Sequence, residues 1–198
     1  TLENSLIQCY FACKQFTILY IKCIFSYMDN IKLLPIDNSN VENCHAINED
    51  NVPNVGTTTF EEFKALVENS DFHRCIIHEK KVIGFIICFQ DSSKTKSFMY
   101  NLKHKNFNEF RNRLKNFMYI DRIAVDTEFR KIGIASSMYE KLLEFCLEFN
   151  IENLTAEINI LPSRNEVSFH FHEKFDFVEI DTKKYSDDYE VSLQKRIL

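Results

Sequence analysis

The fold is decided by the segment YIDRIAVDTEFRKIGIASSMYEKLLEF, residues 119–145. With Met118 in front of it, the segment begins with MYIDRIAVD (118–126), whose branched and aromatic residues indicate a strand. TEFRKIG follows as a turn, and from Ala135 to Phe149 apolar residues recur every three or four positions, which predicts a helix. The first turn of a helix has free N–H groups and a positive dipole end, so this strand–turn–helix is a candidate anion site.

Four residues give the turn its chemical character. Gly133 allows the backbone to approach a phosphate closely, and Ala135 is nearly as small. Arg130 and Lys131 add positive charge. A single glycine at a helix start also fits a plain tight turn, so these residues alone leave both interpretations open.

The turn resembles the acetyl-CoA signature of the GNAT acetyltransferase superfamily. In that signature Gln or Arg is followed by two residues, Gly, one residue, and Gly or Ala. Arg130-x-x-Gly133-x-Ala135 fits it, and the preceding VDTEFR resembles the usual lead-in. Two signatures in order are more specific than one, and a second one follows downstream.

The second family signature is Asn-x-x-(Ala or Ser)-x-x-x-Tyr-x-Lys-x-Gly-Phe, and residues 165–177 read NEVSFHFHEKFDF. Two departures occur: His172 replaces the tyrosine and Asp176 replaces the glycine. Asp tolerates the left-handed backbone conformation, so the turn can form. The resemblance covers Ile31 to Leu198. With CHAINEDNVPNVG (44–56), YIDRIAV and FHEKFDF, it extends to a bacterial and archaeal subgroup of GNAT acetyltransferases predicted from sequence.

The resemblance implies a single α/β domain of the α+β type over residues 28–198. Its mixed central sheet would have about six to seven strands, flanked by helices and splayed between strands 118–126 and 154–160. Acetyl-CoA, the cosubstrate, would lie in that V, its pyrophosphate on backbone amides and its pantetheine arm along the first strand. The cofactor-binding residues implied are Ile123, Ala124, Val125, Arg130, Lys131, Ile132, Gly133, Ile134, Ala135, Ser136, Asn165 and Ser168.

Three residues are candidates for catalysis. An attacking amine must lose a proton, and the carboxylates of Asp121 and Glu157, one on each splayed strand, are candidate bases. An ion pair with a neighbour such as Arg122 is the alternative for Asp121. His172, at the position of the family's tyrosine, is the candidate acid for the departing thiolate. Its alternative is a half-buried helix histidine with one hydrogen bond.

The function that follows is an acetyl-CoA-dependent N-acetyltransferase. An amine of an unidentified small molecule or peptide would attack the thioester directly in a ternary complex. The alternative is a non-catalytic domain that binds or senses acyl-CoA. Many family members are dimers, so a homodimer is a further expectation.

The first 27 residues differ in composition from the rest. They are rich in aliphatic and aromatic residues and hold three of the seven cysteines. We expect an extension upstream of Met28, outside the fold. The alternatives are a membrane anchor, which Lys14 and Lys22 interrupt, and a signal peptide, for which a basic start and a cleavage site are missing.

Composition narrows the function further. Only three glycines occur, and no phosphate-loop motif or dinucleotide fingerprint is present. Seven cysteines without a C-x-x-C pair indicate reduced thiols in a cytoplasmic protein, and neither a metal site nor a disulfide framework is expected. The net charge of −5 argues against nucleic acid as a partner. The basic and aromatic stretch 94–115 keeps two interpretations open: a functional segment, or a helical excursion whose aromatic side chains pack onto the core.

The remaining elements follow from periodicity and turn residues. Thr59 and Glu62 form a capping box that begins a helix to about Asn69. Gly84, inside an apolar run, indicates a bulge or a close backbone approach. The other predicted strands are 31–36, 72–78, 81–89, 175–180 and 189–197, and the other predicted helices end near Asn48 and span 165–174.

Overall fold

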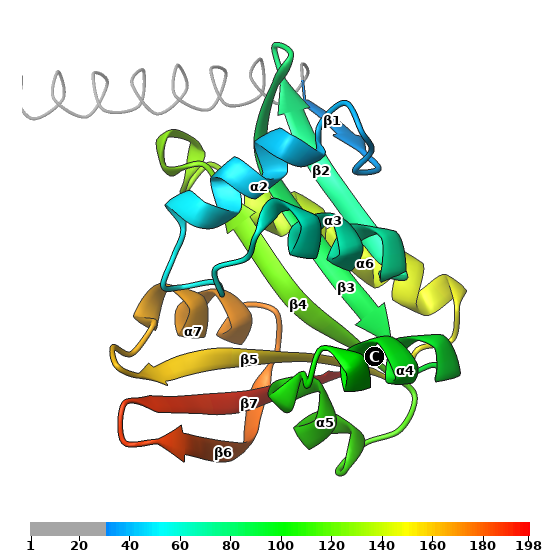
Figure 1. The fold of residues 1–198 in the computed structure, drawn as a ribbon, viewed down its shortest axis with the longest axis vertical. Coiled ribbons are helices and arrows are strands. Elements are labelled where there is room, and N and C mark those ends of the chain that lie inside the picture. The colour runs from blue at the N-terminus through cyan, green and yellow to red at the C-terminus, as the bar shows by residue number, and fades with distance from the viewer. Residues whose placement is uncertain (1–30) are drawn as a thin grey trace, which may run out of the picture.

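The computed structural model describes residues 31–198 (Figure 1). The predicted upstream extension, residues 1–27, lies outside the described residues. The strands are β1 (Ile31–Leu34), β2 (Phe72–His78), β3 (Lys81–Gln90), β4 (Phe117–Val125), β5 (Asn153–Leu161), β6 (Val178–Ser186) and β7 (Tyr189–Ile197). The helices are α2 (Val41–Asp50), α3 (Phe60–Asn69), α4 (Ser93–Asn101), α5 (Lys105–Arg111), α6 (Ile134–Glu148) and α7 (Glu166–Glu173).

These seven strands form one mixed sheet, which confirms the predicted mixed sheet of about six to seven strands, and their order is β1-β2-β3-β4-β5-β7-β6. Every neighbouring pair is antiparallel except β4 and β5. These two pair in parallel only from Phe117–Ile120 to Asn153–Ala156 and then separate. Figure 1 shows the resulting V, which opens toward α7. The predicted splay of the sheet is therefore confirmed.

Each face of the sheet carries its own hydrophobic core. One core contains residues of α2, α3, α4 and α5, including Phe63 and Phe107, and defines the front face. The other contains residues of α6, including Met138 and Leu142, and Phe177 just after α7, and defines the back face. Side chains of β4 and β5 therefore belong to one core or to the other, according to the face of the sheet on which they lie.

Several predictions from single residues are confirmed. Thr59 accepts from the Glu62 amide, and the Glu62 carboxylate accepts from the Thr59 amide, so the capping box is present. The pairing of β2 with β3 shifts register next to Gly84, which is the predicted bulge. Asp176 adopts the left-handed conformation, with φ of 59°, after α7.

Three strand boundaries were wrong. The first strand ends at Leu34 because Pro35 has no N–H for the ladder. The strand predicted at residues 175–180 begins at Val178, since the preceding residues form the turn that closes α7. In that turn the Phe177 amide donates to the His172 carbonyl at 3.1 Å. The strand continues to Ser186, because its pairing with β7 extends to Ser186 and Tyr189.

The connection between β3 and β4 is a helical excursion. It forms α4 and α5, and the side chains of Phe107 and Phe110 are fully buried against β4. The interpretation that its aromatic residues pack onto the core is confirmed for these two. Tyr100, with 77% of its surface exposed, is an exception.

No helix among residues 31–198 has the length and apolar character needed to cross a bilayer. The same residues hold no group of three or more His, Cys, Asp or Glu side chains placed to hold a metal ion. The four cysteines described, Cys44, Cys75, Cys88 and Cys146, are buried free thiols.

A methyl group at Gly84 tests the close approach between β3 and β4. A Cβ there would lie 3.1 Å from the carbonyl oxygen of Ala124 and 3.3 Å from Ile134 Cγ2, both in packed surroundings. We expect Gly84→Ala to lower the free energy of unfolding by about 1–3 kcal/mol. Gly56→Ala is the control, because a Cβ there meets no atom within 4 Å. Urea unfolding followed by circular dichroism measures both, and equal stability of the two variants would contradict this packing.

Candidate active site

The turn before α6 is shaped as an anion site. Lys131 and Gly133 both have positive φ, 65° and 94°, which turns successive backbone N–H groups toward the same side. Gly133 caps α6 without a side-chain hydrogen bond, so the first-turn amides of this 15-residue helix have no side-chain cap. A Cβ on Gly133 would meet no atom within 4 Å, so the backbone is open to a ligand.

Some of the predicted phosphate-binding residues pack into the core, and others are exposed to solvent. Ile134 is buried and Ile132 packs partly against the back-face core, so these side chains fix the turn. Lys131 and Gly133 are exposed, and Ala135 and Ser136 are partly exposed, as a ligand site requires. The backbone from residue 131 to residue 136 is therefore exposed in part, and its N–H groups could hold an anion.

Arg130 is engaged elsewhere. Its Nη2 donates to Asn51 Oδ1 at 2.7 Å, and its Nε donates to the Val125 carbonyl at 3.4 Å. Asn51 ends α2 on the front face of the sheet. The guanidinium of the motif arginine is thus bonded to the α2–α3 connection.

Ile123, Ala124 and Val125 lie on β4 beyond its last pair with β5. They remain paired with β3, opposite Ile86, Phe85 and Gly84. A register shift at Ile87/Cys88 leaves Asp121 as an extra residue on β4, which is a bulge at the start of the splay. Among residues 31–198, no strand pairs with the other edge of β4 at these residues, although the Val125 carbonyl accepts from Arg130 and Asn51.

Asp121 is locked in a buried ion pair. Its Oδ1 accepts from His104 Nε2 at 2.8 Å, its Oδ2 accepts from Arg122 Nε at 2.7 Å, and its side chain is 1% exposed. Burial alone would raise the pKa of Asp121, but the Arg122 charge and the His104 hydrogen bond outweigh it and hold the pKa below its usual range. Asp121 thus matches its alternative interpretation, the ion pair with Arg122.

Glu157 has the opposite environment. It follows the last paired residue of β5, Ala156, and stands opposite Leu193 of the front-face core. Its Oε2 is shielded from solvent and makes no hydrogen bond of ordinary geometry among residues 31–198. Burial raises the pKa of Glu157. The neighbouring Tyr119 hydroxyl and Asn106 amide act to lower this pKa, but they do not outweigh the burial. The two carboxylates of the V therefore differ in availability: the Glu157 oxygen is free to take a proton.

Two contacts that the sequence did not indicate come from α5. His104 caps this helix, because its Nδ1 accepts from the Phe107 amide at 3.3 Å, and its Nε2 therefore holds the proton donated to Asp121. Asn106 accepts from the Tyr185 hydroxyl at 2.8 Å and donates to the Tyr189 hydroxyl at 3.3 Å. The start of α5 thus ties β4 to the hairpin of β6 and β7.

His172 is held within the protein. It is 3% exposed, with Nδ1 at 2.8 Å from the Ser168 carbonyl and Nε2 at 2.7 Å from the Tyr139 hydroxyl. A carbonyl only accepts, so Nδ1 carries the proton and Nε2 accepts from Tyr139. Burial lowers the pKa of His172 to about 4. With both nitrogens engaged and the ring neutral, the geometry favours a structural role over that of a general acid.

The side chain of Asn165 caps α7. Its Oδ1 accepts from the Ser168 amide at 3.1 Å, and the Ser168 hydroxyl lies 3.3 Å from His172 Nδ1. The two residues that the resemblance placed at the cofactor thus organise the first turn of α7. This helix stands at the mouth of the V (Figure 1).

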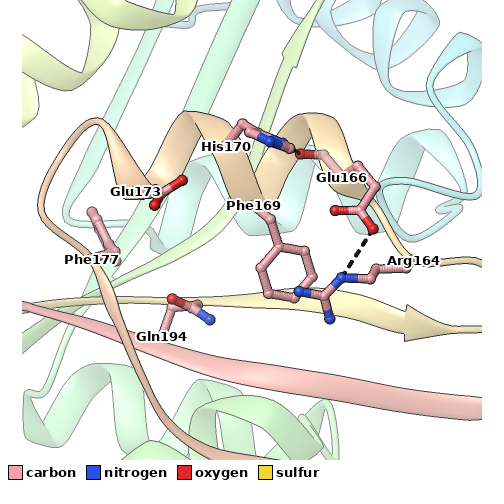
Figure 2. Close-up of a pocket in the computed structure, with 7 residues that line it drawn as sticks. All are labelled: Arg164, Glu166, Phe169, His170, Glu173, Phe177 and Gln194. Atoms are coloured by element: carbon pink, nitrogen blue, oxygen red, sulfur yellow. Dashed lines mark hydrogen bonds and ion pairs between the residues drawn. The ribbon is translucent and has the colours of Figure 1, made fainter.

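A separate cavity of about 350 Å³ lies between α7 and β7 (Figure 2). The Arg164 guanidinium covers the Phe169 ring at 3.6 Å and pairs with Glu166 at 3.1 Å. Gln194, at the base of the cavity, pairs with Ala156 of the back-face core. The cavity contains none of the predicted site residues and lies on the other face of the sheet from Glu157.

Comparison with known proteins gives one family match. The sequence profile of the acetyltransferase (GNAT) family matches residues 41–177. No curated protein sequence matches the chain.

Solved structures share the fold at low identity. Ard1 from Thermoplasma volcanium has a TM-score of 0.66 at 18% identity, covering 85% of this chain and 98% of its own. The ribosomal-protein-alanine N-acetyltransferase from Brucella melitensis has a TM-score of 0.63 at 18% identity, covering 84% and 99%. Arabidopsis thaliana Naa50, in complex with the bisubstrate analogue CoA-Ac-MVNAL, has a TM-score of 0.62 at 16% identity, covering 84% and 98%.

The lowered pKa of His172 predicts a pH-dependent loss of stability. The unfolded histidine binds a proton near pH 6.5, whereas the folded one binds it only near pH 4. Above pH 6.5 the ring is neutral in both states, so this histidine does not lower the free energy of unfolding. As the pH falls toward 4, the unfolded state gains a proton that the folded state does not, and the free energy of unfolding falls by about 3 kcal/mol. We expect the free energy of unfolding to fall less in His172→Gln than in wild type over this range. Urea titrations at both pH values measure it, and parallel pH profiles would contradict the buried neutral ring.

Proposed function

This chain belongs to the acetyltransferase (GNAT) family, and we propose that it transfers the acetyl group of acetyl-CoA to a primary amine of a small molecule or peptide. One observation carries the proposal. The V between β4 and β5 has the open first-turn amides of α6 at one end, and at its apex a buried Glu157 oxygen that accepts from no guanidinium or imidazole among residues 31–198. The free buried thiols are consistent with a cytoplasmic enzyme.

The binding of acetyl-CoA follows from the fit of the turn before α6. Backbone amides from Lys131 to Ser136 would hold the pyrophosphate, helped by the dipole of α6. The edge of β4 at residues 123–125 would pair with the amides of the pantetheine arm, which would compete with Arg130 and Asn51 at the Val125 carbonyl. One N–H near the Asp121 bulge would then polarise the thioester carbonyl.

The chemical step we propose is a direct transfer of the acetyl group. The amine nitrogen forms a bond with the thioester carbonyl carbon, and the carbon–sulfur bond breaks. The proton of the amine passes to Glu157, directly or through a water molecule. The departing thiolate takes a proton from solvent, because the neutral His172 donates its one N–H to the Ser168 carbonyl and its other nitrogen accepts from Tyr139.

Asp121 supports this step without taking part in the proton transfer. Its negative charge is neutralised by Arg122 and by the hydrogen bond from His104, so it keeps the apex of the V rigid and ionised. Glu157 takes the proton more readily than Asp121, since burial raises its pKa.

Replacement of Gly133 tests cofactor binding. Valine is strained at φ of 94° and adds branched atoms where phosphate would approach. We expect Gly133→Val to weaken CoA binding at least tenfold in isothermal titration calorimetry, with the fold intact by circular dichroism. Gly56→Val, in an open loop, is the matched control. Equal affinity of the two variants would refute the anion site.

Replacement of Glu157 tests the base. An acceptor screen that follows CoA thiol release, with mass spectrometry of the product, first identifies an amine. With that amine, Glu157→Gln should lower kcat by roughly 10²–10⁴ and keep the affinity for CoA. In wild type the rate should fall as the pH falls through the raised pKa of Glu157, because the protonated carboxyl cannot accept. The variant should lose this acidic limb.

Glu152→Gln, at an exposed glutamate just before β5, serves as the control for charge removal. A kcat of Glu157→Gln within a few-fold of that control would assign the base elsewhere. CoA binding without release of thiol for any amine would instead favour the non-catalytic alternative.

A further inference from the structure

The connection between α2 and α3, residues 51–59, crosses the V on the front face of the sheet (Figure 1). Asn51 at its start bonds Arg130, beyond the end of β4. Two residues later, the Pro53 carbonyl accepts from Asn159 Nδ2 of β5 at 3.1 Å. The same short segment therefore touches both arms of the V.

Asn51 is the residue that fixes the beginning of this segment. It is 8% exposed, and its Nδ2 donates to the Ile47 carbonyl at 2.8 Å, which closes α2. The same Nδ2 lies 3.5 Å from the Val125 carbonyl, and Oδ1 accepts from Arg130 at 2.7 Å. One amide side chain thus joins α2, the end of β4 and the motif arginine.

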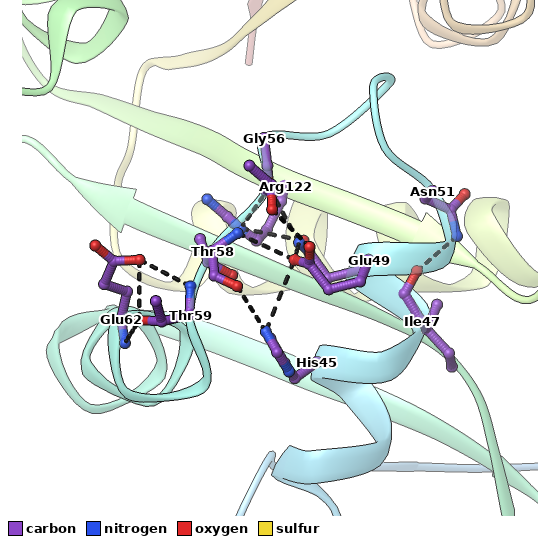
Figure 3. A network of polar contacts seen from close by, with 11 residues as sticks. His45, Ile47, Glu49, Asn51, Gly56, Thr58, Thr59, Glu62 and Arg122 are labelled. Atoms are coloured by element: carbon purple, nitrogen blue, oxygen red, sulfur yellow. Dashed lines mark hydrogen bonds and ion pairs between the residues drawn. The ribbon is translucent and has the colours of Figure 1, made fainter.

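The rest of the connection is fastened independently (Figure 3). Glu49 accepts from the Thr57 hydroxyl and, at 3.0 Å, from the Thr58 amide. The hydrogen bond from Thr57 is the main cause that lowers the pKa of Glu49 to about 2. Arg122 Nη1 donates to the Gly56 carbonyl at 3.4 Å. Residues 56–58 are therefore held without the Asn51 side chain. Residues 51–55 form a turn, in which the Asn54 amide donates to the Asn51 carbonyl at 2.9 Å. This turn is joined to the two arms of the V through the bond of Asn51 with Arg130 and the bond of Pro53 with Asn159.

The connection lies on the side from which an acceptor must come. Tyr119, Asp121 with its His104 partner, and Glu157 face the front, on the same side as α2 and α3. The first turn of α6, where phosphate would bind, packs into the back-face core through Ile134. Arg130 thus belongs by sequence to the cofactor turn and by contact to the acceptor side.

We propose that Arg130 and Asn51 are positioning residues for the acceptor, because their bond holds residues 51–55 as a roof over Glu157. This inference rests on the proposed function. It also assigns the motif arginine a role other than phosphate binding. The two roles compete for one guanidinium, since a phosphate oxygen is a stronger partner than a neutral amide. They therefore predict opposite changes in affinity.

Three variants separate the roles. Asn51→Leu removes both polar contacts, whereas Asn51→Asp keeps an acceptor for Arg130. Asn43→Leu is the matched control, because it makes the same substitution at an exposed asparagine of α2 that lies outside residues 51–55. Arg130→Met removes the guanidinium and keeps the length of the side chain. Thermal melts establish that each variant is folded.

The kinetic readout uses two probes, 1,4-diaminobutane and a tetrapeptide with a free α-amino group. With whichever is acetylated, Asn51→Leu and Arg130→Met should raise the acceptor KM about tenfold, the effect of losing one hydrogen bond to a charged group. The Kd for CoA should stay within twofold. Asn51→Asp should restore the KM toward wild type. A tenfold weaker Kd for CoA in Arg130→Met, with an unchanged acceptor KM in Asn51→Leu, would overturn the proposal.

A second readout needs no acceptor. Hydrogen exchange with and without saturating CoA reports on residues 51–55 and 131–136 separately. In wild type and Asn51→Asp, CoA should slow exchange in both segments; in Asn51→Leu, it should do so only in residues 131–136. Failure of CoA to slow residues 51–55 in wild type would refute the link. If neither amine reacts, the proposed function fails for these acceptors, and the exchange data still decide the link.

Discussion

The structure depends on the point at which β4 and β5 cease to pair. Parallel pairing ends at Ile120 and Ala156, and beyond it neither strand has the other as a hydrogen-bond partner. Unpaired backbone groups inside a protein are costly unless they find other partners. β3 and β7 hold the outer edges of the two arms, while the α2–α3 connection bonds both arms on the front. The inner edges are what remains for a ligand with amide groups of its own.

The same constraint explains why polar residues gather at the apex. A sheet that stays paired buries apolar side chains on both faces, as β3 does almost throughout. Where the strands separate, space opens for Asp121, Glu157 and their partners. The start of helix α5 then closes this space from the front. His104 bonds Asp121 of β4, and Asn106 bonds the two tyrosines of the β6–β7 hairpin. The long connection between β3 and β4 is thus part of the wall of the site.

The sequence predicted what local patterns determine. The strand–turn–helix of residues 118–149, the capping box at Thr59 and the left-handed Asp176 depend on neighbours along the chain, and all three are present. It did not predict pairs such as Arg130 with Asn51 or His172 with Tyr139, which are 79 and 33 residues apart. No spacing rule marks such pairs, since they exist only once the sheet is assembled.

The two carboxylates of the V show why candidates for a base need the structure. Asp121 and Glu157 occupy matching positions on the two arms, and pattern alone treats them alike. Asp121 accepts from a guanidinium and from an imidazole, and both groups stabilise its charged form against protonation. The Oε2 of Glu157 is shielded from solvent and has neither kind of partner among the described residues, so burial favours the protonated form of this carboxylate. When two environments push two pKa values apart, the two carboxylates take different roles. The charged one, Asp121, forms structural ion pairs, and the other, Glu157, can exchange a proton.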